Sequence, residues 1–184
     1  DERAVPLRGV MAAFIFAAQM CSFQSPGGTS GHLLGGVLAA VLLGPYAGTI
    51  VMACVISVQA LIFQDGGLLV LGANIFNMGL IGTFGGYWLY RTVAAALGGE
   101  QGGRPPAAAV AAWTSGVAAA GLTSFQLAIS GPTSLPAALA AMVGWHVLIG
   151  VGEAVITVGA LSFIAASRAD LLRLRDSRMA QAQG

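Results

Sequence analysis

The sequence contains no lysine and little charge of either sign. Its eight basic residues are all arginines, its acidic residues number seven, and charged residues make up 8% of the chain, against about 25% in ordinary soluble domains. Hydrophobic residues fill 57% of the 184 positions, and the mean hydropathy is +0.82. This composition excludes a basic surface for nucleic acid and predicts an integral membrane protein.

Cysteine is scarce as well, and the common catalytic motifs are missing. Cys21 and Cys54 lie in different hydrophobic segments, which fits neither a disulfide framework nor a Cys-x-x-Cys metal site. The sequence has no Walker A, GxSxG or HExxH motif. Ser30 lies two residues before His32, but no third group that would orient the imidazole of a hydrolase can be named. We therefore expect no catalytic residue and no bound cofactor.

Long apolar segments dominate what is present. A spanning helix needs about 20 mostly apolar residues, and fewer where its neighbours tolerate a short one. By this rule the sequence predicts a single transmembrane domain over residues 1–184, an all-α integral membrane protein built as a compact bundle of six transmembrane helices. The expected helices cover approximately residues 9–23, 32–46, 48–64, 68–90, 107–129 and 137–167, and residues 168–184 form a C-terminal tail.

The arginines predict the orientation of this bundle. With six spans they all fall on one side of the membrane: before the first segment, around the loop between the fourth and fifth, and after the sixth. They are Arg3, Arg8, Arg91, Arg104, Arg168, Arg173, Arg175 and Arg178. The positive-inside rule makes this side, with the C-terminus, cytoplasmic. The loops at residues 24–31, 65–67 and 130–134 are then external, and His32 lies near the external mouth.

One glycine-rich segment, PGGTSGHLLGG at residues 26–36, holds one of the chain's two histidines. Its glycines can adopt backbone angles closed to other residues, so the segment can fold tightly and direct the imidazole of His32 at a ligand. The same residues would equally form a plain turn between two helices, with His32 capping the second. The sequence leaves both interpretations open.

Two ionisable residues lie inside the sixth segment. An ionised carboxylate at mid-membrane costs about 2.5–3.5 kcal/mol, so Glu153 must face the interior of the bundle. His146 lies seven residues earlier, two turns back on the same helical face. Such a pair could clasp two helices, relay protons or form part of a metal site.

Asn74 and Asn77 in the fourth segment either join helices through hydrogen bonds or line a cavity.

Several of these stretches together resemble the CbiM/NikM family, the substrate-capture (S) components of energy-coupling factor (ECF) transporters for cobalt and nickel. The resemblance extends from about Gly9 to Ser167 and is carried by AAFIFAAQM, GGTSGHLLGGVLAAVLLGP, LIFQDGG, LGANIFNMGLIGTFGGY and WHVLIGVGEAVIT. It implies a prokaryotic cell-membrane protein whose transported ligand is Ni²⁺ or Co²⁺. The form TSGHLLGG resembles the nickel branch of the family, with cobalt as the second candidate.

The resemblance also implies partners. A transmembrane coupling protein and cytoplasmic ATPase subunits would drive transport, and the partners can include a small membrane accessory subunit. ATP hydrolysis would belong to those partners and not to this chain. The alternative function is an autonomous channel or a proton-coupled metal permease that uses His146 and Glu153.

Family members open with Met-His-Ile-Pro-Asp-Gly and one further transmembrane helix. Their terminal amine and second-residue histidine form most of the metal site, which a loop histidine matching His32 completes. Because the present sequence starts at Asp1, we expect a preceding segment that would bring the helices to seven. His32 is the metal ligand expected in this sequence. The residues expected to surround the metal site and hold the terminal segment are Thr29, Ser30, Asn74 and Asn77.

Overall fold

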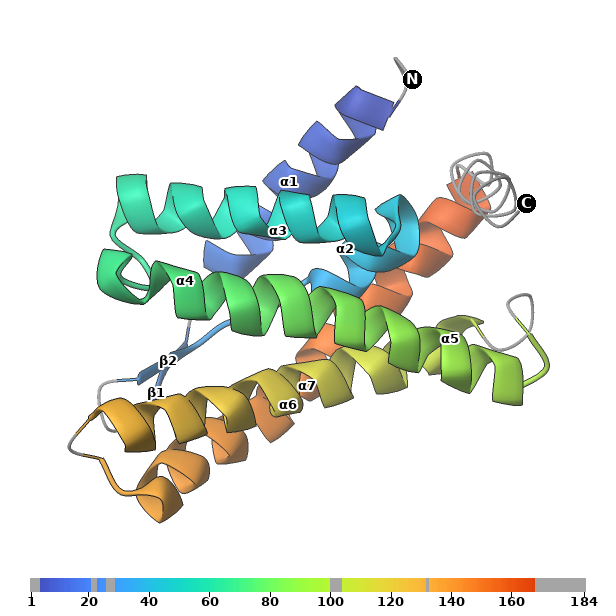
Figure 1. Cartoon of the computed structure of the whole chain (residues 1–184). Helices are drawn as coiled ribbons and strands as arrows, with labels where there is room; N and C mark the ends of the chain where they lie inside the picture. The colour runs from blue at the N-terminus through green and yellow to red at the C-terminus, as the bar shows by residue number, and fades with distance from the viewer. Residues whose placement is uncertain (1–3, 21–22, 26–28, 100–103, 132, 168–184) are drawn as a thin grey trace.

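The computed structural model describes residues 4–20, 23–25, 29–99, 104–131 and 133–167, and these form a bundle of helices (Figure 1). The main helices are α1 (Ala4–Met20), α2 (Gly36–Leu43), α3 (Pro45–Val58), α4 (Leu71–Asn74), α5 (Gly86–Ala96), α6 (Arg104–Ser130) and α7 (Leu135–Ser167). The predicted all-α membrane fold is confirmed, because four continuous helical stretches are long and apolar enough to cross a membrane. They are Pro45–Phe63, Leu68–Ala96, Arg104–Ser130 and Leu135–Ser167.

Two of these stretches are not regular α-helices throughout. The stretch that starts with α3 ends in a π-helical turn, η1 (Gln59–Phe63). The next stretch opens with a 3₁₀ turn, η2 (Leu68–Val70), and contains an eleven-residue π-helical segment, η3 (Ile75–Gly85), between α4 and α5. π-Helical turns are rare and widen the helix locally.

The structure differs from the sequence prediction between α1 and α2. Residues 24–31, expected to be a loop, contain a short antiparallel hairpin of β1 (Phe23–Ser25) and β2 (Thr29–Gly31). The helix expected from His32 starts only at Gly36, and its eight residues cover about 12 Å of a hydrocarbon core about 30 Å thick. The physical reason is the backbone at its two ends. Gly35 has φ +74° and Gly44 has φ +86°, so neither residue continues an α-helix.

Helix α2 occupies the centre of the bundle. All residues from Gly36 to Leu42 are buried, and the helix contacts α3, η3, α5, α6 and α7. A Cβ atom at Gly86 would lie 2.5 Å from Val37 Cγ2, and one at Gly36 would lie 3.0 Å from the Gly82 carbonyl carbon. The small residues therefore let the backbones approach, as expected for helices packed without a hydrophobic drive from lipid.

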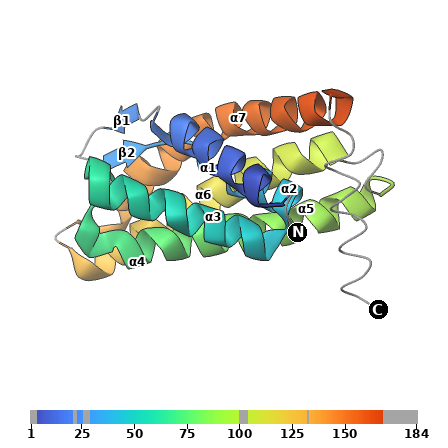
Figure 2. The same ribbon diagram turned by 90° about the horizontal axis from the view of Figure 1, so that it is seen from above.

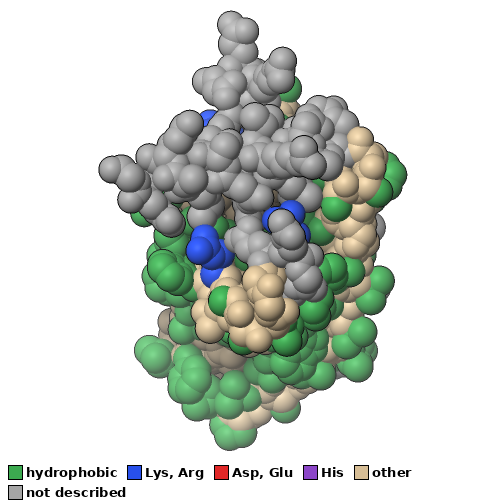
Figure 3. Space-filling model, turned by 90° about the vertical axis from the view of Figure 1, so that its right-hand side faces the viewer, with side chains coloured by type: hydrophobic (Ala, Val, Ile, Leu, Met, Phe, Trp, Pro, Cys, Tyr) green, Lys and Arg blue, Asp and Glu red, His purple; other side chains and the backbone are tan. Residues whose placement is uncertain are grey.

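The two ends of the bundle differ in character. The hairpin lies at one end, where α1 finishes and α6 meets α7, whereas the N-terminus of α1, the end of α5 and the end of α7 lie at the other (Figures 1 and 2). Arginine side chains gather at that second end, while hydrophobic side chains cover the flanks (Figure 3). Arg8 in α1, Arg91 in α5 and Arg104 at the start of α6 belong to these elements.

Candidate functional site

The site is built on a short non-helical segment that links β2 to α2. We call residues 32–35 the His32 strap. The side chain of His32 is partly buried, and its Nδ1 lies 3.2 Å from the carbonyl oxygen of Leu33. A carbonyl oxygen only accepts hydrogen bonds, so this contact requires the proton on Nδ1 and leaves the lone pair on Nε2. Metal-ligating histidines use this arrangement, with one ring nitrogen donating to an oxygen and the other free for the ion.

Helix α7 holds the strap through one carboxylate. Glu153 Oε2 accepts a hydrogen bond from the Leu34 amide at 3.1 Å, and Oε1 accepts one from the Gly35 amide at 2.9 Å. The side chain is 3% exposed. Both amides precede the first turn of α2, where the helix leaves N–H groups without an internal partner. A carboxylate at this position is also favoured by the positive end of the helix dipole.

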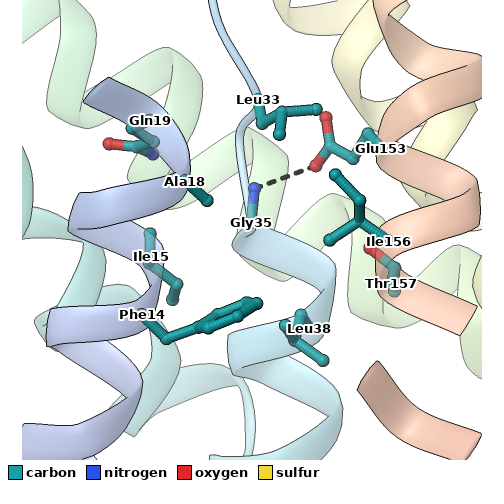
Figure 4. Close-up of a pocket in the computed structure, with 10 residues that line it drawn as sticks. All are labelled: Phe14, Ile15, Ala18, Gln19, Leu33, Gly35, Leu38, Glu153, Ile156 and Thr157. Atoms are coloured by element: carbon teal, nitrogen blue, oxygen red, sulfur yellow. Dashed lines mark hydrogen bonds between the residues drawn. The ribbon is translucent and has the colours of Figure 1, made fainter. Parts of the chain in front are cut away.

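Helix α1 holds the strap from the opposite side. Gln19 Nε2 donates a hydrogen bond to the carbonyl oxygen of Leu34 at 2.6 Å, and Figure 4 shows Gln19 and Glu153 on the two sides of the strap. Gln19 is 1% exposed, and its Oε1 is buried with no hydrogen-bond partner within the described part of the chain. We call Gln19 and Glu153 together the strap clamp.

Two glycines lie beside this contact. A Cβ atom at Gly35 would lie 3.1 Å from Ile15 Cγ2 of α1, so the lack of a side chain at position 35 lets α1 pack against the strap without a shift of Ile15. A Cβ atom at Gly116 of α6 would lie 3.5 Å from Glu153 Oε2. The carboxylate therefore lies where α6, α7 and the strap meet.

The two ionisable residues of α7 face inward together, as their spacing predicts. The buried face of the helix consists of Ala138, Met142, His146, Gly150, Glu153, Thr157 and Leu161. His146 Nδ1 lies 2.7 Å from the carbonyl oxygen of Met142, which again leaves the lone pair on Nε2. Within the described residues no hydrogen bond or ion pair joins His146 to Glu153, whose partners are the strap amides.

The two asparagines predicted to surround the metal have other partners. Asn77 is 2% exposed and bonds to α6: its Nδ2 donates to Gln126 Oε1 at 2.7 Å and to Thr123 Oγ1 at 3.0 Å. Gln126 Nε2 returns a bond to Asn77 Oδ1 at 3.0 Å. Asn74 Nδ2 donates to the carbonyl oxygen of Gly66 at 2.8 Å. These contacts join η3 to α6 and fix the loop before α4.

The roles predicted for Thr29 and Ser30 stay predictions. Their backbones pair with Ser25 and Gln24 in the hairpin, and their side chains lie outside what the structure describes. In the described part of the chain no three His, Cys, Asp or Glu side chains come together as a metal site. His32, the ligand predicted from the sequence, thus lies on a fixed backbone without two further such side chains grouped with it in the described residues. Sequence reasoning did not find the strap clamp, because Gln19 and Glu153 are separated from the strap by 15 and 118–119 residues.

The comparisons with known proteins agree with this fold. Residues 1–171 match the family model CbiM, described as the cobalt uptake substrate-specific transmembrane region. The chain belongs to the CbiM family. An Archaeoglobus fulgidus protein carrying the name fused nickel transport protein NikMN is 43% identical over 173 residues, covering 93% of this chain and 57% of that protein. The cobalt transport protein CbiM of Sorangium cellulosum is 35% identical over 184 residues, covering 95% and 80%.

A solved structure of another protein has a similar fold. A truncated transition metal transporter superposes on this CbiM-family chain with a TM-score of 0.83 at 33% sequence identity. The match covers 90% of this chain and 82% of that one. The fold of the bundle is therefore that of a transition metal transporter, while the A. fulgidus protein extends well beyond the part that this chain spans.

Proposed function

We propose that this CbiM-family chain captures Ni²⁺ or Co²⁺ outside the cell and delivers it as the S component of an ECF-type ATP-driven importer. The observation that supports this best is His32. Its imidazole has Nδ1 directed at a backbone carbonyl and lies on a strap bonded to two helices. The strap follows β2 of the hairpin, which lies at the end of the bundle opposite the described arginines (Figures 1 and 3).

In this proposal His32 Nε2 supplies one ligand. The other ligands follow from the family resemblance: a terminal amine, a deprotonated amide and a second imidazole would complete a four-nitrogen set. Such a set favours square-planar geometry, which suits Ni²⁺. The form of the sequence around His32 favours nickel, with cobalt second, and relatives of the chain carry both metals in their names.

The energy for transport would come from partners. A transmembrane coupling protein and cytoplasmic ATPase subunits, with or without a small membrane accessory subunit, would bind this chain and hydrolyse ATP. The arginine-bearing end would face the cytoplasm of a prokaryotic cell, since positively charged loops are retained inside. His32 would then open to the exterior.

The alternative, a proton-coupled permease with a His146–Glu153 relay, has less support. A relay needs the two groups to exchange protons, and each is bonded to a different backbone segment. Uptake that survives loss of the ATPase partners would favour the permease over the ECF proposal.

The test of the proposal is the metal content and affinity of purified protein. Two forms are compared, residues 1–184 alone and the full-length gene product, each with bound nickel and cobalt measured after dialysis. We expect one ion per molecule of the full-length form. If neither form retains an ion, the resemblance describes the fold and the capture function is wrong.

Replacing His32 tests the ligand itself. Loss of a group that only orients a metal ligand lowers affinity about 10–100-fold, so His32→Ala in the full-length protein should lower nickel affinity by about 100-fold or more. His146→Ala is the matched control, because it removes the chain's other imidazole. Unchanged metal retention by the His32 variant would remove this residue from the site.

A further inference from the structure

Two consecutive peptide groups of the strap are each hydrogen-bonded at both ends. In the first, the Leu33 carbonyl accepts from His32 Nδ1 and the Leu34 amide donates to Glu153 Oε2. In the second, the Leu34 carbonyl accepts from Gln19 Nε2 and the Gly35 amide donates to Glu153 Oε1. The backbone beside His32 is therefore fixed by side chains from α1 and α7.

The first of these peptide groups connects the carboxylate of Glu153 to the ring of His32. Because a peptide group is planar, anchoring its N–H fixes the direction of its carbonyl. The carbonyl in turn fixes the ring through Nδ1. Hydrogen bonds in such a chain also polarise one another, so the carboxylate makes the Leu33 carbonyl a better acceptor and the Nε2 lone pair a better donor to a metal.

The presence of a buried carboxylate at position 153 requires a physical explanation. Its charge costs free energy at membrane depth, and a neutral side chain would avoid that cost. An amide in its place has one oxygen and one NH₂ group, so only one of the two oxygen positions that meet the strap amides would keep an acceptor, and the other would set N–H against N–H. A carboxylate accepts from both, which is the arrangement found.

From this geometry we propose that Glu153 is a positioning residue for metal capture, acting on His32 through the Leu33–Leu34 peptide group, with Gln19 fixing the peptide group that follows. This inference rests on the proposed function, because it takes His32 as the metal ligand. It extends the metal-capture function from the strap to α1 and α7, neither of which supplies the ligand. Metal-ligating histidines are commonly oriented by a carboxylate or a backbone carbonyl, and here both act in series.

The decisive variant is Glu153→Gln in the full-length protein. It keeps the size of the side chain and places an NH₂ group against one of the strap N–H groups. Nickel affinity, measured by competition with a chelator of known affinity, should fall about 10–100-fold. The visible absorption band of bound Ni²⁺ should shift, since the ligand field depends on how the imidazole is held. Thr157→Val is the matched control, because Thr157 is equally buried one turn further along the same face.

A second variant covers the case in which Glu153→Gln does not fold. Gln19→Met keeps the length of the side chain and removes the amide, and with it the hydrogen bond to the Leu34 carbonyl. It should lower nickel affinity less than Glu153→Gln and leave the apparent Tm of the metal-free protein within the range of the Thr157→Val control. An unchanged affinity and spectrum in every folded clamp variant would overturn the proposal.

A double-mutant cycle separates positioning from general loosening of the bundle. If Glu153 acts only through His32, Glu153→Gln lowers affinity in the wild-type background and causes no further loss in the His32→Ala background. Equal losses in both backgrounds would overturn the inference while leaving the proposed function intact. A wild-type protein that binds neither metal, by contrast, would overturn the proposed function.

Discussion

At the scale of single residues, Gly35 lies where the strap, α1 and α2 meet. Its φ of +74° falls in the left-handed region, and a Cβ atom would lie 3.1 Å from Ile15 Cγ2. Gly35→Ala should therefore destabilise the protein by about 1–3 kcal/mol, which corresponds to about 2–4 °C in apparent Tm for each kcal/mol. Thermal unfolding of the metal-free protein measures this change.

Gly152→Ala serves as the control for that experiment. Gly152 is exposed on α7, and a Cβ atom there would meet no other atom within 4 Å. Alanine in a helix is more stable than glycine by about 0.5–1 kcal/mol, so this variant should unfold at the same temperature as the wild type or slightly higher. An equal loss of Tm in both variants would contradict the account of Gly35.

At this scale the sequence predicted which face of a helix carries the polar residues, but not which groups they bond to. The seven-residue spacing of His146 and Glu153 places both on the inward face of α7. Spacing along one helix says nothing about what the opposing element offers, and Glu153 bonds to a strap 118–119 residues away. Gln19 carried no signal beyond being a polar residue in an apolar helix, although it is 1% exposed.

At the scale of elements, the amide pair between η3 and α6 is the clearest cross-link. Asn77 and Gln126 exchange hydrogen bonds of 2.7 and 3.0 Å. Hydrogen bonds between membrane helices contribute about 0.6 kcal/mol on average and up to about 1.7. A double-mutant cycle of Asn77→Ala and Gln126→Ala, followed by unfolding, should give a coupling free energy in this range.

This cycle also tests the role first predicted for Asn77. If Asn77 only joins helices, its alanine variant keeps the nickel affinity of the wild type. If Asn77→Ala lowers nickel affinity and Gln126→Ala does not, Asn77 lies near the metal, as first predicted.

Six apolar segments were predictable from hydropathy, and each contains helix in the structure. The short α2 and the hairpin before it were not predictable. The run from Leu33 to Leu43 is apolar throughout and is typical of a helix that starts at once. Its first residues stay outside the helix because Glu153 and Gln19 bond to their peptide groups, and because Gly35 has a positive φ. Both causes are tertiary.

At the scale of the whole molecule, the separation of arginines from the hairpin predicts an orientation. Thr133→Cys and Ala96→Cys, each made in a protein whose Cys21 and Cys54 have been replaced, place a single thiol at one or the other end of the bundle. Both positions are exposed, so each thiol can be labelled. In intact cells a membrane-impermeant maleimide should label the cysteine at 133. The cysteine at 96 should react only after the membrane is permeabilised. The reverse pattern would place His32 on the cytoplasmic side.

The unequal lengths of the outer helices have a consequence for the surrounding lipid. Helix α1 has 17 residues and α7 has 33, which correspond to about 26 Å and about 50 Å along their axes. Against a hydrocarbon core about 30 Å thick, α1 is slightly short and α7 is long. We expect little mismatch beside α1, whose 17 residues are within the range of a spanning helix, and a tilt of α7 or a thicker bilayer beside it. The lipid should therefore adapt to the protein mainly on the side where α7 lies.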